Sequence, residues 1–286
     1  MSASVLALVL FGALLHASWN SLIKAGADKA AEMALMRVAG LLLALPVLAW
    51  TGWPAPASWG WLLLSGAIHF AYYYLLVNAY ERGNLSVVYP VMRGVAPVLI
   101  ALVGWTWLGE AFSPWAAAGV AAVALGVLWL GLLGRPPRHA QDTRSGLRWA
   151  LLNAVVIAAY TLTDAQGVRA SGNAVAYVMS LALLEAPPFA LWVWWRRRSQ
   201  GAALRAVVQQ RWPWALGGAA ASLASYGIAL WAMTQAPVPL VAAAREASVL
   251  FAVLIGGWLL REPLGLRSWA AALCVVVGLG LLRLAH

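Results

Sequence analysis

Ten long apolar stretches dominate this sequence and restrict what it can fold into. Each is close to the roughly 20 mostly apolar residues that a helix needs to cross the hydrocarbon core of a bilayer. With 63% hydrophobic and 10% charged residues, the chain is far more apolar than a soluble domain, in which about 25% of residues are charged. The sequence therefore predicts an all-α integral membrane protein with ten transmembrane helices. The stretches run roughly over 4–23, 33–50, 59–79, 86–108, 114–133, 149–168, 174–195, 212–232, 239–260 and 269–284.

Internal repetition is the second strong feature. A shift of 152 positions brings Arg93 onto Arg245 and Tyr74 onto Tyr226 without a gap. The matched region covers an apolar stretch, a short acidic turn and the next apolar stretch. Such an internal match indicates that one structural unit occurs twice.

The longest polar connector divides the ten stretches into two sets of five. We therefore predict a first five-helix repeat over 1–133, a connecting loop over 134–148 and a second five-helix repeat over 149–286. Because five is an odd number, the second repeat enters the membrane from the opposite side, so the repeats are inverted. Inverted repeats around a central cavity are typical of secondary transporters, which bind their substrate near the midplane.

The positive charge of the chain is placed between the apolar stretches. The formal net charge is +10, but the arginines do not gather on one face, which argues against a nucleic-acid partner. The loops after the odd-numbered stretches hold most of the Lys and Arg residues, from Lys24 to Arg267, whereas the opposite side holds only Arg169 and Arg283. The positive-inside rule then places the arginine-rich loops in the cytoplasm and both termini outside.

Three short motifs carry a resemblance to a known family: HASWN at 16–20, YPVMRGVAP at 89–97 and LGE at 108–110. With ten helices in two repeats, they resemble the EamA branch of the drug/metabolite transporter superfamily. The second repeat departs from this pattern where LREP at 260–263 has Arg261 in place of the glycine. The resemblance implies a basket of helices around a central cavity and export of small metabolites, with aromatic amino-acid exporters of the YddG type as the nearest characterised members. It also implies cytoplasmic termini, which disagrees with the charge count.

The first helix of each repeat carries two polar side chains four residues apart. These are His16 and Asn20 in one repeat, and Tyr160 and Asp164 at an offset of 144 in the other. Residues four apart share one face of a helix. We expect these side chains to line a wet cavity shared by the repeats. The alternative is that they only stabilise packing through hydrogen bonds between helices.

Aromatic residues mark the third helix of each repeat. His69 and Tyr73 lie on one face of 59–79, and Tyr226 lies in the equivalent stretch of the second repeat. Aromatic rings that face a cavity can stack on a planar substrate, and their hydroxyls can bind its polar end. The alternative for the tyrosines is a position at the membrane interface.

The fourth helix of each repeat contains an arginine in an apolar stretch, Arg93 and Arg245. A charge there costs at least ~2.5 kcal/mol. Each guanidinium offers a fork of donors that fits a substrate carboxylate. Alternatively the charges pair internally: Arg93 with Glu246, which would leave Arg245 less satisfied, and Arg37 with Glu185.

Enzyme signals are scarce. The chain has no Gly-rich loop ending in Gly-Lys, and His16, His69, His139 and His286 do not have metal-ligand spacing. We therefore expect no catalytic residue, no metal and no cofactor. Ser65 near His69 leaves an intramembrane serine hydrolase as one alternative, and a non-transporting scaffold or sensor is another.

The sequence thus predicts a secondary transporter of small organic metabolites, an exporter that works by alternating access. Amino acids are the expected substrate class, with aromatic amino acids as one candidate. The expected partners are a small-molecule substrate and the lipid bilayer, with protons as a candidate coupling ion and no nucleic acid. We expect a multi-pass monomer in the inner (plasma) membrane.

Overall fold

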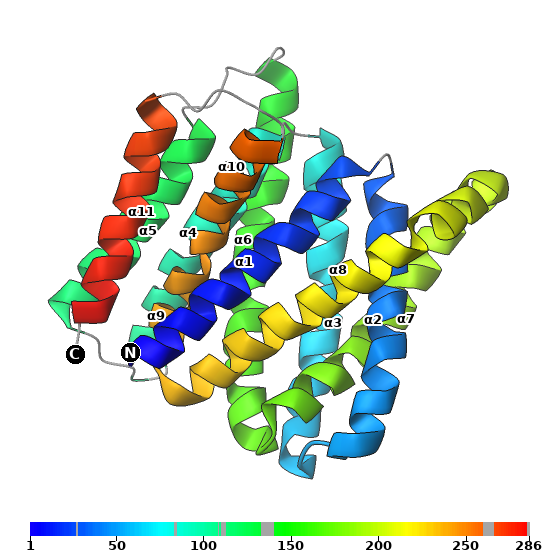
Figure 1. Ribbon diagram of the computed structural model, residues 1–286, viewed down its shortest axis with the longest axis horizontal. Coiled ribbons are helices and arrows are strands. Elements are labelled where there is room, and N and C mark those ends of the chain that lie inside the picture. The colour runs from blue at the N-terminus through cyan, green and yellow to red at the C-terminus, as the bar shows by residue number, and fades with distance from the viewer. Residues whose placement is uncertain are drawn as a thin grey trace.

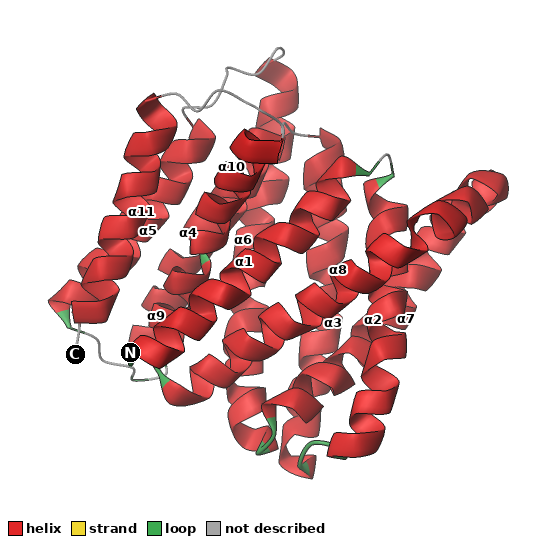
Figure 2. Cartoon of the chain, viewed as in Figure 1, coloured by secondary structure: helices red, strands yellow, loops and turns green. Residues whose placement is uncertain are grey.

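The computed structural model describes residues 1–26, 28–82, 85–107, 109, 113–132, 140–259 and 266–284. All regular elements in these ranges are helices (Figure 2). Two are short 3-10 turns, η1 (Pro56–Ser58) and η2 (Arg198–Gln200). The α-helices are α1 (Ala3–Ala25), α2 (Lys29–Thr51), α3 (Trp59–Arg82), α4 (Leu85–Thr106), α5 (Pro114–Leu132), α6 (Ala140–Ser171), α7 (Ala174–Arg197), α8 (Gly201–Gln235), α9 (Val238–Arg245), α10 (Ala247–Leu259) and α11 (Leu266–Leu284).

The predicted ten transmembrane helices are confirmed. Seven helices are long and apolar enough to cross a membrane, and α5 and α11 are shorter apolar helices. The tenth crossing consists of α9 and α10, which follow each other with one residue between them. The fold is therefore a ten-helix membrane bundle.

Polar side chains fix where several helices begin. The side chain of Asp28 accepts a hydrogen bond from the backbone N–H of Ala31 at 3.1 Å, and that of Asn173 accepts one from Ala176 at 3.1 Å. Both residues satisfy a backbone donor that has no partner inside the first helical turn. Because α2 and α7 are the second helices of the two repeats, the repeats share a helix cap as well as an apolar pattern.

Two helices, α6 and α8, begin about ten residues before the apolar stretches predicted for them. The prediction of a loop over 134–148 is wrong for its later part, because α6 already begins at Ala140; residues 134–139 lie outside the described part. In the same way α8 begins at Gly201, well before the expected 212. An apolar stretch marks only the part of a helix inside the bilayer, whereas a helix satisfies its own backbone hydrogen bonds and can continue into water.

The expected single helix over 239–260 is broken at Glu246. The backbone N–H of Glu246 bonds to the carbonyl of Ala243 at 3.0 Å, and that of Val249 bonds to the carbonyl of Glu246 at 2.9 Å. These are the tight bonds of a 3-10 turn, which often marks a functional hinge within a helix. Broken transmembrane helices are also where many transporters place their binding sites.

The two halves pack as inverted repeats. Equivalent helices meet across the pseudo-two-fold axis, because α2 packs against α7 and α5 against α11 (Figure 1). The other contacts occur in matched pairs: α3 packs on α6 as α8 packs on α1, and α4 packs on α6 as α9 and α10 pack on α1. The first helix of each repeat therefore lies between the third and fourth helices of the other.

Close contact between α5 and α11 depends on glycine. A Cβ atom at Gly278 would lie 2.7 Å from Cγ2 of Val123, 2.8 Å from its backbone nitrogen and 2.9 Å from the carbonyl oxygen of Gly119. Two of these atoms belong to the backbone, so they cannot move aside without shifting a helix. A Cβ atom at Gly280 on the same helix would have nothing within 4 Å.

We expect Gly278→Ala to lower the melting temperature of the detergent-solubilised protein. Overpacking costs typically 1 to 3 kcal/mol, which outweighs the roughly 1 kcal/mol that alanine gains over glycine in a helix. The matched control is Gly280→Ala, which adds the same methyl group to open space and should melt at or above the wild-type temperature. Equal shifts for both variants would contradict the close packing of α5 and α11.

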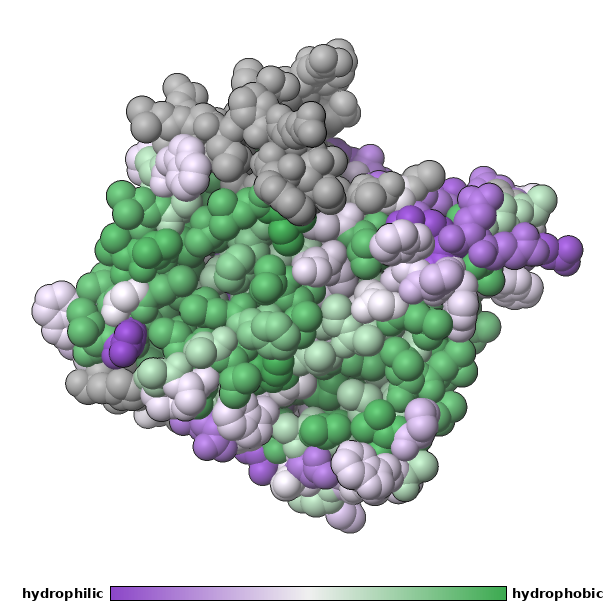
Figure 3. Space-filling model, viewed as in Figure 1, coloured by the Kyte–Doolittle hydropathy of each residue, from purple (hydrophilic) through white to green (hydrophobic). Residues whose placement is uncertain are grey.

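The bundle has two chemically different sides. The N- and C-termini lie at the same edge (Figure 1), which we call the terminal side. The opposite edge, where α1, α3, α5, α7 and α10 end, is the arginine-rich side. Figure 3 shows a broad apolar surface across the helices and a strongly hydrophilic patch at the projecting end of α7 and α8. Exposed Arg196, Arg198 and Arg205 belong to that end.

We expect the arginine-rich side to face the cytoplasm, because positively charged loops are retained there. Cys274 is the single native cysteine and is first replaced by alanine. Ser199→Cys should then resist a membrane-impermeant thiol reagent in intact cells and react after permeabilisation. The exposed Gln235→Cys on the terminal side should react in intact cells. The reverse pattern would show that the termini are cytoplasmic.

Candidate functional site

Buried charges mark the centre of the bundle. Apart from Glu32, which pairs with Arg211 at 3.0 Å near the arginine-rich side, six described side chains are charged and at most 8% exposed. They comprise three cations and three carboxylates, so the buried charges balance. The six are Arg37, Arg93, Arg245, Asp164, Glu185 and Glu246.

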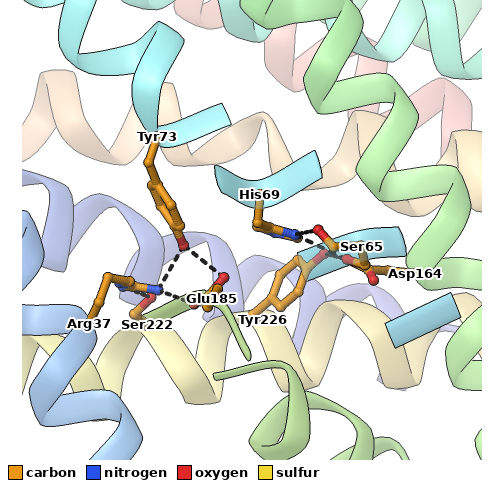
Figure 4. A network of polar contacts seen from close by, with 8 residues as sticks. All are labelled: Arg37, Ser65, His69, Tyr73, Asp164, Glu185, Ser222 and Tyr226. Atoms are coloured by element: carbon orange, nitrogen blue, oxygen red, sulfur yellow. Dashed lines mark hydrogen bonds and ion pairs between the residues drawn. The ribbon is translucent and has the colours of Figure 1, made fainter. Parts of the chain in front are cut away.

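The first cluster joins α2, α3, α7 and α8 around Arg37 (Figure 4). Nη1 of Arg37 lies 3.0 Å from Oε1 of Glu185 and donates to the hydroxyl of Tyr73 at 3.2 Å. Its Nη2 donates to Oγ of Ser222 at 2.8 Å. The Tyr73 hydroxyl in turn donates to Oε2 of Glu185 at 2.9 Å. The internal pair considered from the sequence is therefore formed, and it joins the two repeats.

The second cluster surrounds Asp164 on α6, which is fully buried. The hydroxyl of Tyr177 on α7 donates to its Oδ1 at 2.8 Å, and the hydroxyl of Tyr226 on α8 donates to its Oδ2. Ser65 and His69 on α3 lie beside the carboxylate (Figure 4). Within the described residues no Lys or Arg forms an ion pair with Asp164. Neutral hydroxyl groups therefore hold this carboxylate.

Five aromatic rings lie between the two clusters. The ring of His69 lies 4.3 Å from that of Tyr160 and 5.9 Å from that of Tyr226, centroid to centroid. Tyr72 lies 5.4 Å from Tyr160 and 5.0 Å from Tyr73. We call these five residues the aromatic cluster. Because His69, Tyr73 and Tyr160 are each at most 5% exposed, the rings fill the centre and close it to water in this structure.

The two symmetry-related arginines have different partners. Nε of Arg93 lies 2.9 Å from Oε2 of Glu246, and its Nη2 donates to Oγ of Ser248 at 3.4 Å. Arg245 instead lies over the ring of Tyr226, 5.4 Å from its centroid. No described carboxylate forms an ion pair with Arg245. Glu246 thus neutralises Arg93 at the break between α9 and α10, whereas no described carboxylate neutralises Arg245.

His16 and Asn20 on α1 lie at the edge of this arrangement. The Nδ2 group of Asn20 donates to the backbone carbonyl of His16 at 2.8 Å, so it is used within its own helix. The ring of His16 contacts Trp19 edge to face, 4.9 Å between centroids. His16 is half-buried and close enough to Arg93 and Arg245 to interact with both charges. Of this pair, only His16 is directed to the buried charges.

The aromatic cluster lies between two sets of polar contacts. The Arg37 cluster is on the arginine-rich side of it, and the Asp164 cluster is on the terminal side. Arg37 is about two turns from the arginine-rich start of α2, and Asp164 is about two turns from the terminal-side end of α6. A pocket of about 270 Å³ opens on the arginine-rich side, lined by residues that include Asp28, Tyr80 and Arg197. It lies between α2, α3 and α7, the helices that carry the Arg37 cluster deeper in the bundle. Polar contacts between helices therefore lie on both sides of the aromatic cluster.

Tyr177 is the functional candidate that the sequence analysis missed. Its hydroxyl can reach Asp164 only because residue 167 is glycine, since a Cβ atom there would lie 2.2 Å from that hydroxyl. Gly167 is three residues after Asp164 and so on the same helix face. In the sequence, the glycine at position 167 was the available signal, but a glycine does not show which side chain it makes room for. Ser222 and Ser248 were missed because a single serine in an apolar helix carries no distinctive pattern.

The contact between Ser65 and His69 bears on the hydrolase alternative. Oγ of Ser65 lies 3.1 Å from Nδ1 of His69, and the same nitrogen lies 3.0 Å from the carbonyl oxygen of Ser65. A histidine that activates a nucleophile needs one nitrogen for the hydroxyl and the other for an orienting group. Here a single nitrogen serves both atoms of Ser65, which is itself fully buried. The contact orients the ring within α3.

Comparison with known proteins agrees with this architecture. The family model described as the EamA-like transporter family matches residues 3–132 and 144–284, which is nearly the whole chain. The chain belongs to the EamA-like transporter family. This membership makes it a multi-pass membrane protein and supports a membrane transporter role. The family motif residues 108, 110 and 260–263 lie outside the described part.

Solved structures share the fold. One crystal structure, described only as that of a protein, matches with a TM-score of 0.76 at 17% sequence identity over 100% of both chains. In all, 28 chains of solved structures match. At this identity the similarity shows the fold alone. Among the curated proteins no sequence matches.

We expect Arg93→Ala to destabilise the protein strongly. It leaves Glu246 buried without its partner, and breaking a buried ion pair in this way costs about 3 to 5 kcal/mol. The double variant Arg93→Ala with Glu246→Ala should recover much of the loss. Arg245→Ala is the matched control, because it removes a cation that no described carboxylate binds. Unfolding of the purified variants in detergent measures the effects, and equal losses for the two single variants would refute the difference between the arginines.

Proposed function

We propose that this chain is a secondary transporter that exports amino acids, with aromatic amino acids as the preferred class. The observation that carries the proposal is Arg245, which forms no ion pair with a described carboxylate and lies over the ring of Tyr226 in the aromatic cluster. A guanidinium binds the carboxylate of an amino acid through two parallel hydrogen bonds. The neighbouring rings offer stacking surfaces for a planar side chain.

The proposed site uses residues from both repeats. His69, Tyr160, Tyr226 and Arg245 make direct contacts with the substrate, and His16 lies at the edge. Tyr73, Arg93 and Asn20 are engaged in internal contacts, and we assign them to the walls of the cavity. Lining from both halves fits transporters in which the substrate is bound between inverted repeats.

Alternating access follows from the two closed contacts. Opening toward the arginine-rich side requires separation of Arg37 from Glu185, which would move the first repeat, 1–133, relative to the second, 149–286. Opening toward the terminal side requires separation of Asp164 from Tyr177 or Tyr226. When one contact opens while the other stays closed, substrate reaches the cluster from one side at a time. The short turn at Glu246 gives α9 a place to bend.

The protein is proposed to act as a monomer in the inner (plasma) membrane, with small-molecule substrate and lipid as its partners. A scaffold or sensor would move no substrate, and a hydrolase would release a product. Counterflow of radiolabelled L-phenylalanine, L-tyrosine and L-tryptophan in proteoliposomes separates these classes, because only a transporter exchanges label across the membrane without changing the compound.

We expect Arg245→Gln to abolish selection for the substrate carboxylate. Wild-type protein should be inhibited in counterflow by L-phenylalanine and by 3-phenylpropionate, which both carry that group, far better than by phenethylamine, which lacks it. Loss of a charge-assisted hydrogen-bonded contact of ~1.5 to 3 kcal/mol should weaken inhibition by the two carboxylates by about 10- to 150-fold and leave the amine little changed. Unaltered preference for the carboxylates would remove Arg245 from the site.

A further inference from the structure

Among the buried carboxylates that the structure describes, Asp164 is the one without a cationic partner. Glu185 lies 3.0 Å from Arg37, and Glu246 lies 2.9 Å from Arg93. Asp164 is 0% exposed, yet the groups bonded to it are neutral hydroxyls, those of Tyr177 and Tyr226 and that of Ser65. Hydroxyl donors stabilise a carboxylate but do not neutralise it, and an unneutralised charge at this depth is costly.

The groups that face Asp164 come from every neighbouring helix. His69 faces it from α3, Tyr177 from α7 and Tyr226 from α8, while Tyr160 lies one turn earlier on α6 itself. The cation of α9, Arg245, lies over the ring of Tyr226, 5.4 Å from its centroid. The cation of α4, Arg93, is held in its ion pair with Glu246. No cation therefore contacts Asp164 directly in the described structure.

Tyr226 connects the two buried charges that have no ionic partner among the described residues. Its hydroxyl donates to Asp164, and its ring lies under Arg245. The cation over the ring of Tyr226 and the carboxylate at its hydroxyl are together complementary to a zwitterion. An amino acid with its carboxylate on Arg245 would direct its ammonium group toward Asp164, whose two oxygens offer about four lone-pair sites, more than the tyrosines occupy.

We infer that Asp164 binds the ammonium group of the substrate and, when the substrate leaves, binds a proton in its place. This inference rests on the proposed function and assigns its coupling ion. Ammonium and proton compete for one carboxylate, so substrate moving in one direction exchanges for a proton moving in the other. The proton enters from the side to which substrate is released and leaves on the side from which the next substrate binds. Proton uptake would then drive export.

The matching position of the first repeat supports a special role for Asp164. An offset of 144 relates it to Asn20, which has the same shape but no charge and bonds within its own helix. The fold therefore accommodates a neutral amide at this place in one repeat, so the charge of Asp164 is not a requirement of the helix packing.

The test uses the full-length protein in proteoliposomes with L-phenylalanine and a pH-sensitive dye in the lumen. Wild-type protein should move protons opposite to L-phenylalanine, and its transport should depend on an imposed pH gradient. Asp164→Asn should lose both the proton movement and the pH dependence. Tyr177→Phe is the matched variant: it removes a hydroxyl from the same cluster but keeps the carboxyl group, and it should retain a pH dependence.

The outcomes separate this inference from the proposed function. Wild-type counterflow without proton movement, dependence on a sodium gradient instead, or pH dependence that survives in Asp164→Asn would overturn the inference and leave transport intact. Absence of counterflow for all three aromatic amino acids would overturn the proposed function.

A spectroscopic measurement decides the role of Asp164 even where the asparagine variant fails to fold or no probe moves. The chain has only three aspartates, Asp28, Asp142 and Asp164, and only Asp164 is in the middle of a membrane span. Carbon-13 labelling of aspartate should reveal, in pH-difference infrared spectra of the wild-type protein, a buried carboxyl group that gains and loses a proton. Added L-phenylalanine should suppress that signal. Its absence over the full stable pH range would refute the assignment.

Discussion

The cost of a charge inside the bilayer governs how this protein is assembled. Six of the described charged side chains are buried at the centre of the bundle, and the fold brings opposite charges from different helices into contact, Arg37 with Glu185 and Arg93 with Glu246. Both pairs join one repeat to the other. Buried ion pairs contribute little net stability compared with apolar packing, but breaking one is expensive, so they fix how the two halves meet.

The proposed site lies where the two repeats depart from symmetry. The repeats are built on one plan, with equivalent caps at Asp28 and Asn173 and matched helix contacts. Arg93 and Arg245 occupy equivalent positions, yet among the described residues only Arg93 has a carboxylate partner. The proposed binding of an amino acid needs such asymmetry, because two identical half-sites facing each other would suit a symmetric ligand and not one with two different polar groups.

Polar contacts suit the closures on the two sides of the aromatic cluster. A hydrogen-bonded pair has two definite arrangements, formed or separated, and water replaces the lost partners once a pathway opens. An apolar closure of the same area would resist hydration. In the proposed transport cycle the Arg37 and Asp164 clusters would open in turn, while α5 and α11 stay closely packed through glycine.

The sequence by itself determined the membrane environment, the ten crossings and the inverted repeat, because these follow from the length and number of apolar stretches and from an odd number of helices per repeat. It also identified the arginines and several aromatic residues of the proposed site. It did not determine the break at Glu246, the start of α6 at Ala140 or the role of Tyr177. Only the tertiary structure decided which arginine is neutralised and which carboxylate is left to hydroxyl groups. Those outcomes depend on contacts between helices more than 60 residues apart in the chain, as for Tyr226 and Asp164, and no local pattern encodes the distance between two side chains on different helices.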